Sequence, residues 1–274
     1  MKQQPIGVFD SGYGGLTILK EFIHTLPQYD YFYLGDNARA PYGPRSFETV
    51  YRYTLQCVQW LFARGCPLVI VACNTASAKA LRTIQQNDLP RINPQNRVLG
   101  VIRPTTEMIG TFTRSNEVGI LATAGTVLSE SYVIETKKFY PHVKVYQEAC
   151  PMWVPLVENN EYKGPGADYF VEKNVKNLLG KGKLIDTVLL ACTHYPLLKD
   201  KIRAYLPDHI SLLSQGEIVA KSLEHYFERH PEMESRCSKQ GTVQFYTTDS
   251  TEDFDAHAAT FFGKSIHSEH VNIE

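Results

Sequence analysis

Two observations in the sequence predict an α/β fold with parallel sheets. Short apolar segments alternate along the chain with longer amphipathic segments, which is the order expected of repeated strand–helix–strand units. The short segments are rich in Val, Ile and Leu and contain few alternating polar residues, which is typical of strands covered by helices on both faces of a sheet.

The short apolar segments are the predicted strands. They cover residues 6–9, 31–34, 69–72, 98–102, 118–122, 143–147, 187–191, 210–213 and 243–246. The amphipathic segments between most of them predict helices, for example at residues 46–63, 76–86, 129–139, 169–179, 215–228 and 254–262.

The predicted domain boundary lies in the sequence DLPRINPQN, residues 88–96. Two prolines and three Asn or Gln residues give this stretch the composition of a linker. A second crossing between domains is expected near residues 207–211. The two crossings divide the chain into a first α/β domain of residues 1–97 plus 211–274, which holds both chain ends, and a second α/β domain of residues 98–210 inserted into it.

Composition and charge exclude several classes of protein. The 274 residues are enough for one large or two ordinary domains, and a hydrophobic content of 43% with 21% charged residues is ordinary for a globular protein. The formal net charge of −1 argues against a general nucleic-acid binder or a protein held on an anionic membrane. No apolar run approaches the length of a membrane span, and the N-terminal MKQQPIGVFD lacks the apolar core of a signal peptide, so a cytoplasmic location is expected.

The six cysteines are expected to be reduced thiols rather than disulfides or zinc ligands. The chain is long, it shows no export signal, and no two cysteines have CxxC spacing. Four of them are expected to serve packing alone: Cys57, Cys66, Cys150 and Cys237. No metal site is predicted, because a solvated C-terminal segment is the simplest interpretation of His257, His267 and His270.

The other two cysteines occupy matching positions in two similar stretches. In PLVIVACNTASA and DTVLLACTHYPL an apolar strand ends in Ala-Cys and is followed by threonine, another polar residue and the start of a helix. These stretches place Cys73 and Cys192 beyond the carboxyl ends of two parallel strands, where ligands bind in open α/β sheets. If the two domains face each other, the two thiols flank one cleft.

Polar loops follow other predicted strands at the same edge of each sheet. They are DSGYGG at 10–15, GDNARAPYG at 35–43 and TAGT at 123–126. Free N–H groups and the helix dipole at helix N-termini in such loops favour carboxylate groups. The same setting is expected to lower the pKa of a thiol from about 8.5 toward neutrality.

Two thiols on opposite sides of a small ligand suit inversion of a stereocentre. One thiolate removes a proton from carbon, and the other thiol delivers a proton to the opposite face, so no cofactor is needed. A one-base enzyme would not need this symmetry. A thiol–disulfide enzyme would need cysteines close enough to bond, usually as CxxC.

At this point the sequence resembles the glutamate racemases of the aspartate/glutamate racemase superfamily, over nearly the whole chain. The matching stretches are IGVFDSGYGGLTIL, YLGDNARAPYG, VIVACNTASA, ILATAGT, CPMWVPLVE and LLACTHYPLL. The resemblance implies two similar flavodoxin-like domains with parallel sheets, an active site in the cleft between them, and a homodimer. It further implies cofactor-independent interconversion of L- and D-glutamate, which supplies D-glutamate for peptidoglycan.

The resemblance also implies roles for individual residues. The acid/base catalysts are Cys73, acting on D-glutamate, and Cys192, acting on L-glutamate. Substrate contacts are implied for nine residues: Asp10, Ser11, Tyr42, Gly43, Asn74, Thr75, Thr126, Thr193 and His194. Supporting carboxylates outside substrate contact are implied for Asp36 and Glu158.

Two departures from the family pattern and three alternatives remain at this point. Arg103 in GVIRPT and Gly125 in TAGT differ from the commoner residues, and they bear on regulation and dimer contacts more than on the reaction.

The alternatives are a racemase of aspartate or a hydantoin, a non-catalytic amino-acid sensor on the same scaffold, and a thiol oxidoreductase. The intact pair of cysteine motifs argues against the sensor, and the lack of CxxC argues against the oxidoreductase.

Overall fold

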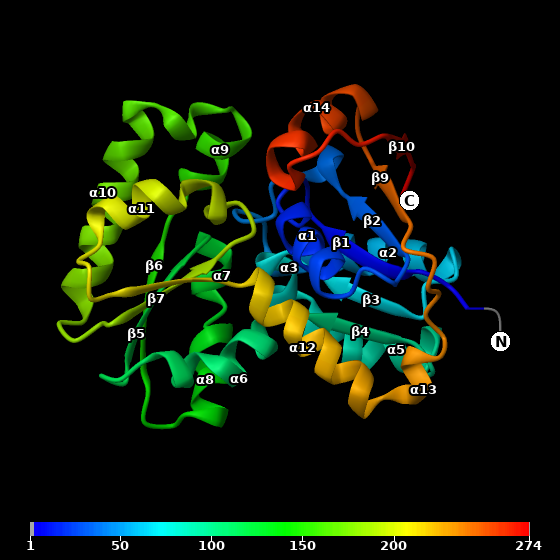
Figure 1. The fold of residues 1–274 in the computed structure, drawn as a ribbon, viewed down its shortest axis with the longest axis horizontal. Helices are drawn as coiled ribbons and strands as arrows, with labels where there is room; N and C mark the ends of the chain where they lie inside the picture. The colour runs from blue at the N-terminus through cyan, green and yellow to red at the C-terminus, as the bar shows by residue number, and fades with distance from the viewer. Residues whose placement is uncertain (1–2, 274) are drawn as a thin grey trace.

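The computed structural model describes residues 3–273, and it consists of two parallel sheets that lie side by side (Figure 1). The larger sheet has the strand order β10-β9-β2-β1-β3-β4, and the smaller has the order β6-β5-β7-β8. The strands are β1 (Ile6–Asp10), β2 (Tyr31–Gly35), β3 (Leu68–Val71), β4 (Arg97–Gly100), β5 (Glu117–Ala122), β6 (Lys144–Ala149), β7 (Thr187–Ala191), β8 (Ser211–Ser214), β9 (Val243–Thr247) and β10 (Ser268–His270).

Helices connect most of these strands. The longer ones are α1 (Leu16–Thr25), α2 (Phe47–Ala63), α6 (Ile102–Phe112), α8 (Ser131–Phe139), α10 (Pro165–Lys181), α12 (Gly216–Arg229) and α14 (Thr251–Phe262). Shorter helical segments are η1 (Asn37–Arg39), α3 (Asn74–Lys79), α4 (Leu81–Thr83), η2 (Ile84–Asp88), α5 (Leu89–Ile92), α7 (Ala124–Leu128), α9 (Trp153–Glu158), η3 (Glu161–Lys163), η4 (Tyr195–Leu198), α11 (Lys199–Tyr205) and α13 (Pro231–Glu234). Within residues 3–273, every helix is too short or too polar to cross a membrane.

The two sheets repeat one topology, which confirms the predicted α/β fold with two similar flavodoxin-like parallel sheets. In each sheet, four consecutive strands take the spatial order second, first, third, fourth: β2-β1-β3-β4 and β6-β5-β7-β8. All the pairings are parallel. The strand order therefore reverses between β1 and β3 in one sheet and between β5 and β7 in the other, and ligands bind at such switch points.

Successive side chains of a strand pack in two different hydrophobic clusters, one on each face of the sheet, as expected when helices cover both faces. In β1, Val8 packs with the side chains of α1, whereas the next residue, Phe9, packs with those of α2. In β7, Leu190 belongs to the cluster that includes α10 and Leu189 to the cluster that includes α6. This double burial explains why the strands were recognisable as continuous apolar runs.

The chain crosses between the sheets slightly later than predicted at both crossings. Residues 98–100 pair with β3 in the larger sheet, so the strand predicted at 98–102 ends at Gly100. Residues 211–214 pair with β7 in the smaller sheet, although they were expected in the first domain. The linker-like stretch at 88–96 contains α5, with Pro90 in its first turn, and a turn after it. Proline and asparagine therefore marked local helix ends, not the change of sheet.

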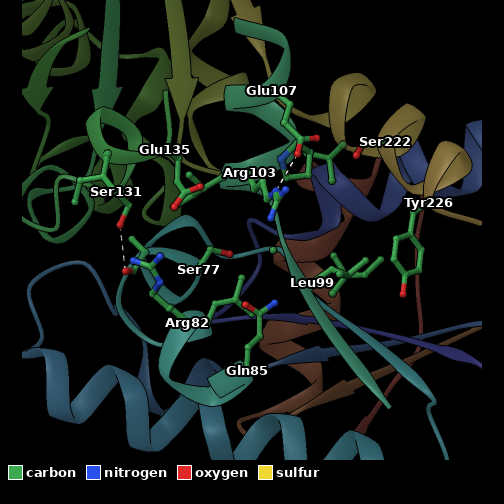
Figure 2. A pocket seen from close by; sticks show the side chains of 18 of the residues that line it. Ser77, Arg82, Gln85, Leu99, Arg103, Glu107, Ser131, Glu135, Ser222 and Tyr226 are labelled. Carbon is green, nitrogen blue, oxygen red and sulfur yellow. Dashed lines mark hydrogen bonds and ion pairs between the residues drawn. The ribbon is translucent and has the colours of Figure 1, made fainter. Parts of the chain in front are cut away.

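A cavity of about 740 Å³ lies between the two halves next to the first crossing. It is lined from the larger half by Ser77, Arg82 and Leu99, and from the smaller half by Arg103 and Glu135 (Figure 2). Neither Cys73 nor Cys192 lines it. The unusual Arg103 belongs to this cavity, where its Nε donates to Glu107 Oε1 at 2.8 Å.

Candidate active site

Cys73 lies two residues beyond β3, at the start of α3. It is the N-cap of this helix and has extended backbone angles, and its Sγ accepts from the N–H of Ala76 at 3.5 Å. The thiol donates to Ser11 Oγ at 3.4 Å. The side chain is only 5% exposed. The strand end therefore places the thiol inside the protein, facing the loop that follows β1.

The expectation of a lowered pKa is wrong for Cys73. Burial and the neighbouring charge of Asp10 raise the pKa of Cys73 to about 12, against the opposing effect of hydrogen bonds with Ser11 and Ala76. Desolvation of the thiolate outweighs the helix N-terminus here because the site is closed to water. The charge of Cys192 adds to the rise, so the two thiols lie near enough to interact.

Asp10 is fully buried at the end of β1 and lies between the two cysteine loops. Its Oδ2 accepts from the N–H of Gly12 at 3.0 Å, and its Oδ1 accepts from Thr193 Oγ1 at 3.4 Å. Burial raises the pKa of Asp10, while the charge of His194 and the backbone hydrogen bonds oppose the rise. Asp10 thus joins the loop after β1 to the loop after β7.

Cys192 directly follows β7 and is paired with a histidine and a glutamate. Its Sγ lies 4.0 Å from His194 Nδ1, and His194 Nε2 lies 3.0 Å from Glu158 Oε1. Burial disfavours the charged ring, but the hydrogen bonds and charges of Cys192 and Glu158 outweigh it and raise the pKa of His194 to about 10. A protonated His194 supplies a positive charge beside the Cys192 sulfur.

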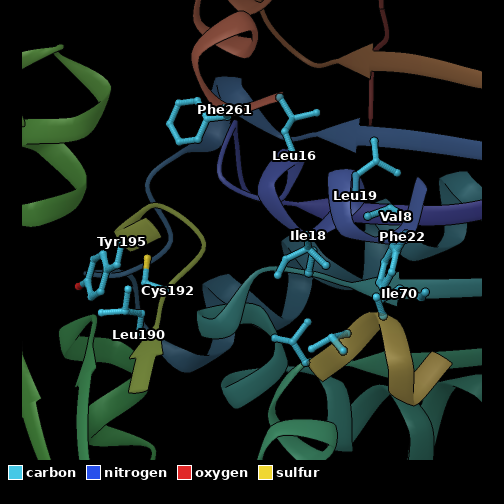
Figure 3. Packing of buried hydrophobic residues seen from close by; sticks show 14 of the residues in the cluster. Val8, Leu16, Ile18, Leu19, Phe22, Ile70, Leu190, Cys192, Tyr195 and Phe261 are labelled. Atoms are coloured by element: carbon cyan, nitrogen blue, oxygen red, sulfur yellow. The ribbon is translucent and has the colours of Figure 1, made fainter. Parts of the chain in front are cut away.

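An aromatic ring from the larger half packs on one side against the group formed by Cys192, His194 and Glu158. The ring of Phe261 on α14 meets the ring of His194 edge-on, with centroids 5.2 Å apart. Figure 3 shows Phe261 on the side of the larger half that faces Cys192 and Tyr195. A second cavity, of about 460 Å³, reaches Cys192, Thr193 and Phe261 from the side of α1 and β8.

The loops of the two halves approach each other at a glycine. A Cβ atom at Gly14 would overlap Thr193 Oγ1 and would lie 2.5 Å from His194 Nδ1, closer than real Cβ contacts come. Thr17 on α1 also donates to the carbonyl oxygen of Thr193 at 3.0 Å. Glycine at position 14 therefore allows the loop after β1 to pack directly on the Cys192 loop.

Away from the Gly14 contact, a chain of threonine hydroxyls joins the start of α3 in the larger half to the loop after β5 in the smaller half. Thr75 Oγ1 lies 2.9 Å from Thr123 Oγ1, which donates to Thr126 Oγ1 at 3.1 Å. A Cβ atom at Gly43 would lie 3.3 Å from Thr123 Cβ, so the PYG loop reaches the same place. The predicted residues Gly43, Thr75 and Thr126 are thus brought together, with Thr123 between them.

Tyr42 and Asn74 are buried close to this group, but their side chains are already engaged by protein. The Tyr42 hydroxyl donates to Asp36 Oδ2, and Arg39 and Thr248 also donate to this buried carboxylate. Asn74 Nδ2 donates to Gln215 Oε1 at 2.7 Å, and its Oδ1 accepts from the Tyr132 hydroxyl at 2.6 Å.

Three residues of this region were missed by the sequence analysis. Thr123 stood in the quoted TAGT motif, and Gln215 follows β8, so the rule that ligands lie beyond strand ends had signals for both. Tyr132 lies within α8, and nothing in its local sequence distinguishes it from a packing residue.

No group of three metal-binding side chains is arranged as a metal site within the described part of the chain. The six cysteines are free thiols.

Comparisons with known proteins agree with one another. A family model described as Asp/Glu/Hydantoin racemase matches residues 16–223. A glutamate racemase of Listeria monocytogenes is 39% identical over 253 residues, which cover 92% of this chain and 91% of that protein. Among solved structures, glutamate racemase isoform RacE1 from Bacillus anthracis has a TM-score of 0.90 at 32% identity, covering 100% of this chain and 99% of that one. Glutamate racemase from Francisella tularensis, solved with D-glutamate, has a TM-score of 0.88 at 30% identity, with coverage of 100% and 99%.

Proposed function

The chain belongs to the Asp/Glu/Hydantoin racemase family, and from this premise we propose that it is a glutamate racemase that works by proton transfer between two thiols. One observation carries the proposal. Two free, buried cysteines follow equivalent strands of two repeated sheets, and their loops meet at Asp10. The similar proteins from Listeria monocytogenes, Bacillus anthracis and Francisella tularensis, all named glutamate racemases, support glutamate as the substrate.

In the proposed reaction, one cysteine removes the α-proton and the other replaces it from the opposite face. With L-glutamate, the Cys192 thiolate takes the α-proton and becomes a thiol. The Cys73 thiol then gives its proton to the other face of the α-carbon and becomes a thiolate. One proton leaves the carbon and one arrives, so the reaction needs no redox partner. The reverse sequence converts D-glutamate.

The two thiols are supported by different neighbours. His194, held by Glu158 at 3.0 Å, stabilises the thiolate of Cys192. Asp10 and Ser11 lie beside Cys73, and a bound substrate ammonium at this place lowers the pKa of the Cys73 thiol by its positive charge. Each thiol therefore has its own group that stabilises its thiolate, so either thiol can start the reaction from its own enantiomer.

The α-carbon of an amino acid is a weak acid, so the site must also stabilise the carbanion-like transition state. The backbone amides of the residues after Asp10, Cys73 and Cys192 are the natural donors, since each follows a strand end. We place the α-carboxylate and ammonium near Asp10, Ser11, Asn74 and Thr193.

The substrate's side-chain carboxylate is placed near the threonine hydroxyls. Thr126 offers an O–H donor there, because its oxygen accepts from Thr123, and Thr75 holds Thr123 in place by donating to it. The peptide groups of Tyr42 and Gly43 lie on the same side. Tyr42 contributes through its backbone, because its hydroxyl is bound to Asp36. Asp36 acts by holding Arg39 and Tyr42 in place.

The wider role follows from the activity. We place the protein in the cytoplasm, where it supplies D-glutamate for peptidoglycan, and we expect a homodimer. Support for self-association comes from exposed apolar side chains on the packed helices α6 and α8. These are Met108, Phe112, Ile134 and Phe139.

The test is incubation of the purified protein with L-glutamate in D₂O without added cofactor. Circular dichroism follows racemisation, and mass spectrometry follows α-deuterium. Cys73→Ser and Cys192→Ser should each abolish racemisation, whereas Cys66→Ser, a buried thiol of the core, should retain it in proportion to folded protein. A folded wild-type protein that racemises aspartate or a hydantoin but not glutamate would contradict the proposal.

A further inference from the structure

A closed group of buried hydrogen bonds lies next to both cysteines, and two of its three side chains, Tyr132 and Gln215, have no role in the proposed reaction. Gln215 Nε2 donates to the Tyr132 hydroxyl at 2.7 Å, and Tyr132 donates to Asn74 Oδ1 at 2.6 Å. Asn74 Nδ2 completes the ring by donating to Gln215 Oε1 at 2.7 Å. Gln215 Nε2 also donates to Thr105 Oγ1 at 2.9 Å. We call Asn74, Tyr132 and Gln215 the hinge triad.

The hinge triad connects both places where the chain crosses between the sheets. Gln215 lies at the crossing between β8 and α12, and its Nε2 is 3.4 Å from the carbonyl oxygen of Val101, at the crossing between β4 and α6. Asn74 comes from the larger half and Tyr132 from α8 of the smaller half. A Cβ atom at Gly216 would lie 2.5 Å from Glu21 Cγ, so the start of α12 is also packed tightly against α1. The Gln215 side-chain amide thus contacts both crossings and one residue from each half.

The triad has one orientation only. Asn74, Tyr132 and Gln215 are each at most 3% exposed, so their polar atoms have no access to bulk water as an alternative partner. Thr105 Oγ1 donates to the carbonyl oxygen of Val101 and therefore accepts from Gln215 Nε2, which fixes the Gln215 amide. The Oε1 of Gln215 then requires the Nδ2 donor of Asn74. Because one Asn74 N–H is committed to Gln215, the direction of its second N–H is fixed as well.

This fixed group is in contact with the catalytic pair. Asn74 directly follows Cys73 at the start of α3. Gln215 lines the 460 Å³ cavity together with Cys192 and Thr193. The charge of Cys192 is also among the causes that raise the pKa of Tyr132, after burial. The triad therefore lies between the element that carries one thiol and the cavity wall that carries the other.

We propose that Gln215 is a positioning residue of the racemase: through Asn74 and Tyr132 it fixes the two halves so that the thiols of Cys73 and Cys192 face opposite sides of one substrate. This inference rests on the proposed function. It predicts a specific failure when the triad is broken. One thiol still removes the α-proton, but the second thiol is misplaced, so the carbanion lives longer. In D₂O the first thiol then exchanges the proton it has taken for deuterium from the solvent, and it returns deuterium to the original face more often.

The test uses Gln215→Met, which keeps the length of the side chain and removes its hydrogen bonds, and Tyr132→Phe, which removes the donor to Asn74. Gln85→Met is the matched control, since Gln85 donates to the backbone of Val98 in β4 and does not contact the triad. Each variant is incubated with L-glutamate and, separately, with D-glutamate in D₂O. At low conversion, racemisation and the α-deuterium content of the recovered starting enantiomer are measured, with the fraction of folded protein from near-UV circular dichroism.

Gln215→Met is expected to lower kcat about tenfold or more, in line with the large rate cost of small misplacements. Deuterium in the recovered starting enantiomer is near zero for the wild type and should rise in the variant, so the ratio of exchange to inversion rises in both directions. Tyr132→Phe should raise the ratio in the same sense, and Gln85→Met should leave it at the wild-type value. A purely structural role would lower both rates in proportion to folded protein and leave the ratio unchanged.

The outcomes separate the two proposals. An active wild-type enzyme with an unchanged ratio in folded Gln215→Met overturns the positioning role alone. A wild-type protein that neither racemises glutamate nor exchanges its α-proton overturns both the proposed function and the inference that rests on it.

Discussion

Alanine at position 14 is expected to separate the two halves of the site without replacing a catalytic group. Gly14 lies in the loop after β1, and a Cβ atom there would overlap Thr193 Oγ1. It would also lie 2.5 Å from Nδ1 and 2.7 Å from Cε1 of His194. Both partners belong to the loop that carries Cys192, and His194 is held on its far side by Glu158 and Phe261. The loop as a whole must therefore move, since a single flexible side chain cannot relieve the contact.

The required displacement sets the expected size of the effect. Ordinary van der Waals contact begins near 3.4 Å, so His194 must move by about 1 Å. Misplacement by about 1 Å costs on the order of 10²-fold in rate when a reaction depends on aligned groups. Overpacking of this kind destabilises a protein by about 1–3 kcal/mol. Gly14→Ala should therefore lower kcat by about 10²-fold while the protein remains folded.

The assay is steady-state racemisation in both directions, with thermal unfolding of the same samples. Gly180→Ala is the matched control: nothing lies within 4 Å of a Cβ atom there, and alanine is favoured over glycine in a helix such as α10. It should keep wild-type kcat and equal or higher stability. A folded Gly14→Ala enzyme with wild-type kcat would refute the close packing of the two loops as a requirement for catalysis.

Two further predictions concern the groups around the thiols. Hydrogen bonds and charges of Cys192 and Glu158 raise the pKa of His194 to about 10 despite burial, so the stability that the charged ring contributes is complete below pH 6.5 and is lost as the pH rises toward 10. Glu158→Gln should therefore lower the free energy of unfolding by up to a few kcal/mol at pH 6 and by much less near pH 10. Urea titrations at the two pH values measure this difference. An equal loss of stability at both pH values would contradict the prediction. Tyr42→Phe should lower the free energy of unfolding by about 1–3 kcal/mol, because Asp36 loses a buried donor, while KM for glutamate stays near the wild-type value. A large rise in KM with unchanged stability would instead assign the Tyr42 hydroxyl to the substrate.

The parts of the site that follow strand ends could be predicted from the sequence. Strands buried on both faces are continuous apolar runs, so the positions of Asp10, Cys73 and Cys192 just beyond them were visible. The repeated Ala-Cys-Asn/Thr context is matched in the structure by β3 and β7, which are the equivalent third strands of two sheets with the same strand order. Local sequence is sufficient here because a strand end is itself a local feature.

Features that depend on contacts between distant segments could not be predicted in this way. The sheet to which residues 98–100 and 211–214 belong is decided by their pairing with β3 and β7, not by nearby prolines. The raised pKa of Cys73 follows from burial among segments that are distant in the sequence, which outweighs the helix N-terminus. The hinge triad joins α3, α8 and the residue after β8, so no single stretch of sequence contains its signal.

Proton transfer between two opposed thiols is tested most directly by the isotope content of the first product formed. L-glutamate is incubated with the wild-type enzyme in D₂O, the reaction is stopped at low conversion, and the enantiomers are separated and weighed by mass spectrometry. The D-glutamate should carry deuterium at the α-carbon in nearly every molecule, while the recovered L-glutamate keeps its original proton. D-glutamate that retains the substrate's proton, or deuterium spread equally over both enantiomers from the start, would contradict two separate thiols acting on opposite faces.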